Sequence, residues 1–316
     1  MSVIRKATAG VLAGLFLAAA SASAQINSLS REELIKYTAQ NPYERFPDGR
    51  PKVPDNLLKE FEQMSSEEVM GAGAVPGGRG GANSVTFVSG FQVLNPGKKL
   101  IGRAVTLQLM PTRPEVAQVD AEEWKKKGNE VPLTHQSALD LLGPGDVIVI
   151  DAGGNVDAAG IIGDNLAYYI WKKTGTGFVI DGAIRDLEGI ARFDMAGYFR
   201  AAVPPAIRGL MVTGINVPVR IGNATVLPGD VVFGDREGVN FIPPHMVQGL
   251  VEAARITHIH DEWTRMKFEQ GKYKSTDIYS RPHDPALIKE YEEYLKQKLG
   301  AAAYEDYRKR QAQRGP

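Results

Sequence analysis

The chain contains 316 residues, with 37 Lys and Arg against 37 Asp and Glu, so its formal net charge is zero. This balance indicates no nucleic-acid-binding surface and no attraction to an anionic membrane. The sequence has no cysteine, which excludes disulfide bonds and thiolate metal sites. A chain of this length can bury a sufficient hydrophobic core without either.

Residues 1–24 have the pattern of a secretory signal peptide. A positively charged start is followed by a short apolar run at residues 11–20 and by Ala22-Ser23-Ala24, a typical cleavage pattern. The apolar run is shorter than the roughly 20 residues of a membrane-spanning helix, which disfavours the alternative of a membrane anchor. We therefore expect cleavage after Ala24, a periplasmic or secreted protein, and no membrane span after the signal is removed.

Residues 25–95 are predicted to form an N-terminal extension of helices and loops. Ser30 precedes acidic residues and predicts a helix start, a second helix is expected at residues 55–64, and residues 65–68 can cap a third. The glycine-dense residues 71–81 lack the spacing of a phosphate-binding loop. A flexible loop is therefore the favoured interpretation of that stretch.

Residues 96–256 carry the pattern of an α/β core. Apolar runs, most of them bounded by glycine, predict strands at residues 101–107, 146–151, 177–182 and 209–214. A helix at residues 166–173 falls between the second and third of these runs and stops before Gly175. Alternation of strand, helix and strand is typical of an α/β layer. Glycine turns between residues 217 and 242 predict β-hairpins.

A long helix is predicted from Pro243, with a buried stripe of Met246, Leu250, Ala253 and Ile256, and this helix could continue through Trp263 and Met266. Residues 257–316 are expected to form a C-terminal helical arm. Farther along, the charged segment that starts at Pro285 is expected to be one helix, with apolar and aromatic side chains at Tyr291, Tyr294 and Leu295. We expect these side chains to cover a neighbouring subunit.

Two short motifs point to a divalent-metal site. Gly163-Asp164-Asn165-Leu166 precedes a helix, and Arg185-Asp186 follows the strand at residues 177–182, with residues 165–184 between Asp164 and Arg185. The motifs supply two carboxylates, a guanidinium and a helix N-terminus. These groups together suit a metal ion and a small 2-oxo acid.

Asp186 is the candidate metal ligand. Mg²⁺ or Mn²⁺ prefers carboxylate oxygen and retains several waters, so one protein carboxylate and a chelating keto acid suffice. The alternative is that Asp186 caps a helix at residues 187–196. The planar fork of Arg185 matches a substrate carboxylate and would stabilise enolate charge, with a surface ion pair as its alternative.

These motifs belong to a set of blocks that resembles the RraA-like family, which includes the 4-hydroxy-4-methyl-2-oxoglutarate aldolases and the regulators of ribonuclease activity A. The other blocks are residues 145–151, 179–182, 228–230 and 234–239, and the resemblance extends over about residues 101–262. It implies a ββα swivelling-domain sandwich in the α/β class, here with added N-terminal and C-terminal helical segments. It also implies assembly into trimers or dimers of trimers.

The resemblance assigns further roles at the site. Backbone N–H groups of Gly163, Asn165 and Leu166 would bind the pyruvyl carboxylate at the helix N-terminus. Asp164 would hold a metal-bound water, with simple helix capping as its alternative. Glu262, from the C-terminal helix of an adjacent subunit, would orient the same water. A zinc cluster around His258 and His260 is disfavoured, because residues two apart on a helix face different ways.

The function implied is a metal-dependent class II aldolase. It would cleave a 4-hydroxy-2-oxo acid by retro-aldol chemistry through a metal-bound pyruvate enolate, with oxaloacetate decarboxylation as a side reaction. Two alternatives remain open at this point. One is a non-catalytic, protein-binding regulator, and the other is an exported family member that acts on a larger, unrelated substrate.

Overall fold

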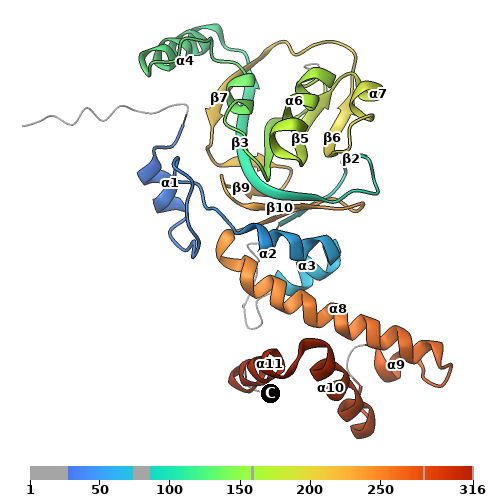
Figure 1. Ribbon diagram of the computed structural model, residues 1–316. Coiled ribbons are helices and arrows are strands. Elements are labelled where there is room, and N and C mark those ends of the chain that lie inside the picture. Colours follow the sequence, from blue (N-terminus) through green and yellow to red (C-terminus); the bar gives the residue numbers. More distant parts are fainter. Residues whose placement is uncertain (1–27, 74–85, 158–159, 280–281, 315–316) are drawn as a thin grey trace, which may run out of the picture.

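The computed structural model describes residues 28–73, 86–157, 160–279 and 282–314 (Figure 1). The predicted signal peptide and most of the glycine-dense stretch at 71–81 lie outside these residues. Within them, no helix combines the length and apolar character that crossing a membrane requires.

The centre of the fold is a mixed β-sheet. Its strands are β1 (Thr86–Val88), β2 (Gln92–Leu94), β3 (Leu100–Pro111), β4 (Asp146–Asn155), β5 (Gly177–Ile184), β6 (Ala196–Ala202), β7 (Leu210–Ile215), β10 (Val231–Gly234) and β11 (Val239–Ile242). The order is β1-β11-β10-β3-β4-β5-β6-β2, and β7 pairs with β3 off this path. Strands β3 to β6 are parallel, and the remaining pairings are antiparallel. A separate hairpin consists of β8 (Val219–Ile221) and β9 (Ala224–Val226).

The described residues also form eleven α-helices, of which the last three pack on the long helix before them or on one another. They are α1 (Arg31–Tyr37), α2 (Asp55–Glu60), α3 (Ser66–Gly73), α4 (Pro114–Lys126), α5 (Gln136–Leu139), α6 (Asp164–Thr174), α7 (Leu187–Ile190), α8 (Val247–Glu269), α9 (Ser275–Ile278), α10 (Pro285–Leu299) and α11 (Ala301–Arg314), with 3₁₀ turns η1 (Phe61–Gln63) and η2 (Pro244–Met246). The mixed α/β fold predicted from the sequence is confirmed.

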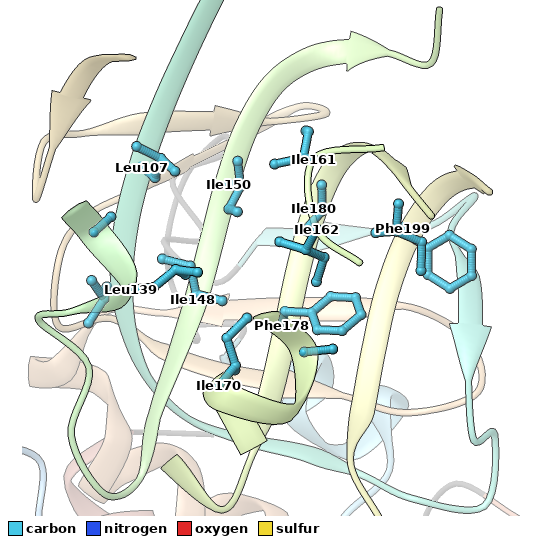
Figure 2. Close-up of a cluster of buried hydrophobic side chains, with 14 of the residues drawn as sticks. Leu107, Leu139, Ile148, Ile150, Ile161, Ile162, Ile170, Phe178, Ile180 and Phe199 are labelled. Atoms are coloured by element: carbon cyan, nitrogen blue, oxygen red, sulfur yellow. The ribbon is translucent and has the colours of Figure 1, made fainter. Parts of the chain in front are cut away.

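Both faces of the parallel strands are buried, as expected for strands that carry helices or hairpins on each side. On one face, Ile148 and Ile150 belong to a cluster that includes Ile170 of α6, which Figure 2 shows. On the other face, Val147 and Val149 pack in a cluster that contains the β8–β9 hairpin. The alternating positions of β4 therefore serve two separate cores.

The N-terminal extension packs on the core. The predicted start of α1 is confirmed by a capping box, in which Ser30 Oγ accepts from the N–H of Glu33 and a Glu33 carboxylate oxygen accepts from the N–H of Ser30. The helix predicted at residues 55–64 is α2 followed by η1. Strands β1 and β2, which come before residue 96, join the sheet beside β11 and β6.

The C-terminal helices differ from the prediction in two respects. The segment from Pro285 is two helices, because Gly300 has a left-handed φ of 81° and ends α10. Leu295 is buried, and Tyr291 and Tyr294 are partly buried, in clusters with α8 of the same chain. The expectation that these side chains need a neighbouring subunit to cover them is therefore wrong.

Three further details correct the predicted elements. The helix expected at residues 187–196 is the single turn α7, after which the chain enters β6. Leu250 is buried in α8 as predicted, but Val251 and Ala254 face the core, whereas Ala253 is only partly buried. The helices α4 and α5, between β3 and β4, were not predicted.

Candidate functional site

The predicted site lies where the end of β5 meets the segment that leads into α6. The N–H of Arg185 donates to the carbonyl of Ile162, and the N–H of Ile161 donates to the carbonyl of Ala183, both at 2.9 Å. Figure 2 shows the side chains of Ile161 and Ile162 in the hydrophobic cluster beside β5. These contacts fix the start of α6 against the residues that follow β5.

Gly163 is the point of closest approach between the two motifs. A Cβ atom placed on Gly163 would lie 2.4 Å from Asp186 Oδ2 and 2.9 Å from Arg185 Cζ. Both distances are shorter than a van der Waals contact, so only glycine leaves room for the carboxylate and guanidinium here. The structure therefore brings Gly163, Arg185 and Asp186 together, although Gly163 precedes them by more than a full helix and strand.

Asp164 is held in a similar way on the other side of the helix start. A Cβ atom on Gly189 of α7 would lie 2.9 Å from Asp164 Cβ and 3.0 Å from Asp164 Oδ2. The other carboxylate oxygen, Oδ1, accepts from the N–H of Asn165 at 2.7 Å. Asp164 thus makes a local bond at the start of α6 while it lies directly over the turn that follows Asp186.

Asp186 does not use its side chain to cap α7. It occupies the N-cap position with a left-handed backbone, φ 57° and ψ 38°, and makes no side-chain capping hydrogen bond. A left-handed conformation costs a non-glycine residue about 1–2 kcal/mol, and such strain is concentrated at functional sites. The carboxylate instead accepts from Arg185 Nη1 at 2.8 Å.

Arg185 and Asp186 remain accessible, with side chains 36% and 37% exposed. Arg185 lines a cavity of about 620 Å³, together with Asn165 and Leu166 from the first turn of α6. The predicted substrate-binding residues Asn165, Leu166 and Arg185 therefore share one cavity. The positive end of the α6 dipole is directed at the same region.

Glu262 lies elsewhere in the chain. It is on α8, which Figure 1 shows on the far side of the sheet from α6 and α7. Its carboxylate pairs with Lys298 at 2.7 Å, and the hydrogen bond from Lys298 lowers its pKa. One chain does not bring Glu262 to Arg185, so a role for it requires a neighbouring subunit.

The opposite wall of the cavity was missed by the sequence analysis. It comes from α4 and from the residues just before α5, including Asp120 and His135. Burial lowers the pKa of His135, and the positive charge of Arg185 lowers it further, so the imidazole favours its neutral form. A usable signal did exist, because Val116, Asp120 and Trp124 recur every four residues and place an aspartate on the inner face of a helix.

The donor set suits a hard divalent ion that keeps most of its own waters. Asp186 offers an accessible carboxylate oxygen, and Gly163 leaves open the space that a Cβ would fill beside it. Among the described residues no group of three or more His, Asp or Glu side chains could hold a metal ion. The residues therefore fit Mg²⁺ or Mn²⁺ completed by water and substrate oxygens, rather than a closed protein cage.

Similarity to known proteins identifies the family to which a chain with this fold and site belongs. The family described as "RraA-like: Aldolase/RraA" matches residues 77–240, just over half of the 316 residues. This chain belongs to the RraA-like family, as the motifs predicted.

Two relatives carry the name of an activity. A 4-hydroxy-4-methyl-2-oxoglutarate aldolase of Thermus thermophilus is 31% identical over 108 residues, which is 34% of this chain and 65% of that protein. A Halalkalibacterium halodurans protein named after the same aldolase is 35% identical over 119 residues, 38% of this chain and 56% of that protein. The chain thus spans less than two thirds of either relative.

A solved structure covers more of the chain. Streptomyces coelicolor RraAS2, described as an unusual member of the RNase ES inhibitor RraA protein family, is 28% identical. It covers 68% of this chain and 100% of its own, with a TM-score of 0.58. The α/β core is therefore shared with a family member over its whole length, and this chain has further residues at its termini.

Proposed function

We propose that this protein is a divalent-metal-dependent lyase that cleaves a 4-hydroxy-2-oxo acid and releases pyruvate. The observation that carries the proposal is the contact at Gly163, where the Asp186 carboxylate, the Arg185 guanidinium and the start of α6 converge. The aldolase names of the two relatives support the same activity.

Substrate binding would rely on positive charge and on backbone donors. The Arg185 fork matches the carboxylate of a 2-oxo acid, and two of its neighbours in the cavity, Asn165 and Leu166, belong to a helix N-terminus that favours anions. Asp186 holds Arg185 through one nitrogen, which orients the guanidinium beside Gly163. The carboxyl end of the substrate is thus fixed at the first turn of α6.

The reaction breaks the bond between C3 and C4 of the substrate. The 4-hydroxyl loses its proton as C4 becomes a carbonyl, and the bonding electron pair passes to C3 and the keto oxygen as pyruvate enolate, which takes a proton at C3. An ion held by Asp186 would supply Lewis acidity at the keto oxygen. Asp164, at the start of α6, would orient the water that removes the hydroxyl proton. Decarboxylation of oxaloacetate yields the same enolate.

The proposal is tested by pyruvate release from purified protein. A panel of 4-hydroxy-2-oxo acids is supplied with Mg²⁺, with Mn²⁺, or with EDTA. We expect pyruvate to form with either ion and release to stop with EDTA. Absence of pyruvate from every member of the panel, or release that EDTA leaves unchanged, would show that the proposed function is wrong.

A further inference from the structure

The cavity beside Arg185 extends well beyond the two motifs. Its volume of about 620 Å³ lies in the range of roughly 300–1,000 Å³ found for pockets that enclose whole small molecules. Arg185, Asn165 and Leu166 occupy one side of it, and residues of α4 occupy another. A substrate gripped at Arg185 therefore has its far end directed into space that α4 helps to enclose.

Asp120 is an unusual component of this wall. Within α4 it is the buried residue, only 1% exposed, while its neighbours on the helix are partly or fully exposed. Neither oxygen of its carboxylate has a hydrogen-bond partner among the described residues. Burial of a carboxylate without a partner is unfavourable, and such groups in native proteins call for a functional explanation.

Among the described residues, no cation pairs directly with Asp120. The titratable side chains that share the cavity with it are His135 and Arg185. Arg185 pairs with Asp186 at 2.8 Å, and the lowered pKa of His135 favours an uncharged ring. Among the described residues, Asp120 also belongs to no cluster that could hold a metal ion. The missing partner is therefore best supplied by a ligand.

We infer that Asp120 selects the far end of the substrate, accepting a hydrogen bond from a hydroxyl group there and disfavouring a carboxylate. This inference rests on the proposed function, because it takes Arg185 as the grip on the keto-acid end. A hydroxyl donor would satisfy the buried oxygens. A second substrate carboxylate would instead be repelled by the like charge of Asp120.

Two ligands that cannot be cleaved separate this selectivity from turnover. N-(2-hydroxyethyl)oxamate and N-oxalylglycine share an oxamate head and differ at the far end, with a hydroxyl in the first and a carboxylate in the second. Calorimetric titration in the presence of Mg²⁺ should show that the wild-type protein binds the hydroxyl ligand at least about tenfold more tightly than the carboxylate ligand. A hydrogen bond to a charged group strengthens binding by about this factor or more.

Asp120→Asn is the decisive variant, because it removes the charge and nearly preserves the shape. We expect it to bind the two ligands with similar affinity, and to melt at the same temperature as wild type or higher because a buried charge is gone. Asp120→Ser provides a second variant with the same expected loss of selectivity. Glu122→Gln, at an exposed position of the same helix, is the control that should keep the wild-type ratio.

The outcomes separate the two proposals. Equal binding of both ligands to wild type, or an unchanged ratio in Asp120→Asn and Asp120→Ser, would overturn the role of Asp120 even if pyruvate is released. A hydroxyl preference that depends on Asp120, without pyruvate release from any 4-hydroxy-2-oxo acid, would support the selectivity and overturn the lyase proposal alone.

Discussion

The two walls of the cavity differ in the carboxylates that they contain or adjoin. Arg185 belongs to the first wall and pairs with Asp186, which lies beside the cavity lining and is 37% exposed. In the second wall, α4 buries Asp120 to 1%, and Asp120 has no hydrogen-bond partner among the described residues. The first wall is held by backbone hydrogen bonds at the carboxyl end of β5. The second wall includes α4, whose buried Asp120 lines the cavity. We propose on this basis that the chemistry and the choice of substrate reside on separate elements.

The largest expected effect is on the first wall. Asp186→Asn should lower turnover by roughly 10³-fold or more, because the ion's Lewis acidity amounts to several kilocalories per mole. The amide keeps the shape but lacks the anionic oxygen that a hard cation prefers. Metal titration by calorimetry and thermal melting should show lost Mg²⁺ binding in a folded protein.

Arg185→Lys is the matched contrast to Asp186→Asn. It keeps the charge but loses the fork, so it should weaken substrate binding and leave Mg²⁺ affinity largely unchanged. If Asp186→Asn binds Mg²⁺ as tightly as wild type, Asp186 has a structural role and the comparison between the walls loses its basis.

A second test concerns the contact that joins the motifs. In Gly163→Ala the new Cβ would displace Asp186 Oδ2 and Arg185 Cζ, and a misplacement of about 1 Å can lower turnover ~10²-fold. The backbone of Gly163, at φ −116°, is one that alanine adopts without strain, so the melting temperature should change little. Gly97→Ala, with no atom within 4 Å of its added Cβ, is the control. Full activity in Gly163→Ala would contradict the assigned geometry.

A smaller effect is expected from a residue outside both walls. We propose that Glu262 completes the site of a neighbouring subunit in a trimer or dimer of trimers, and that Glu262→Gln lowers turnover about tenfold, as for other residues that orient groups around a metal. Light scattering should give a multiple of three subunits. Mixed oligomers of Glu262→Gln and Asp186→Asn should regain part of the activity, because some sites then contain both native residues. A fully active monomer would remove Glu262 from the site.

The smallest expected effect is a pH dependence on the α4 side. The pKa of His135 is lowered from its ordinary value of 6.5 by burial and by Arg185, so the unfolded chain binds more protons in mildly acidic solution. The His135 contribution to stability is therefore present above pH 6.5 and is lost as the pH falls below it. Urea denaturation should show that, between pH 7.5 and 5.5, the free energy of unfolding falls slightly less for His135→Gln than for wild type. An identical fall in both proteins would show that the cavity does not lower the pKa of His135.

The sequence by itself determined the local features of the fold. Ser30 and Glu33 form the capping box that starts α1, and the glycine-bounded apolar runs at β4 and β5 specify buried strands. Both features could be predicted because they depend on residues that are neighbours in the chain. Gly163, Asp164, Arg185 and Asp186 were identified as candidate site residues in the same way, from residue types at a defined spacing.

Tertiary structure decided which residues share a space. The left-handed backbone of Asp186 and the contact of its carboxylate with Gly163 arise from packing of α6 against the end of β5, which no local pattern specifies. Asp120 becomes a cavity residue only because α4 folds over that site, and Tyr291 finds its cover on α8 of the same chain. Contacts between distant segments depend on how whole elements pack, and this information is spread over the chain rather than carried by any one motif.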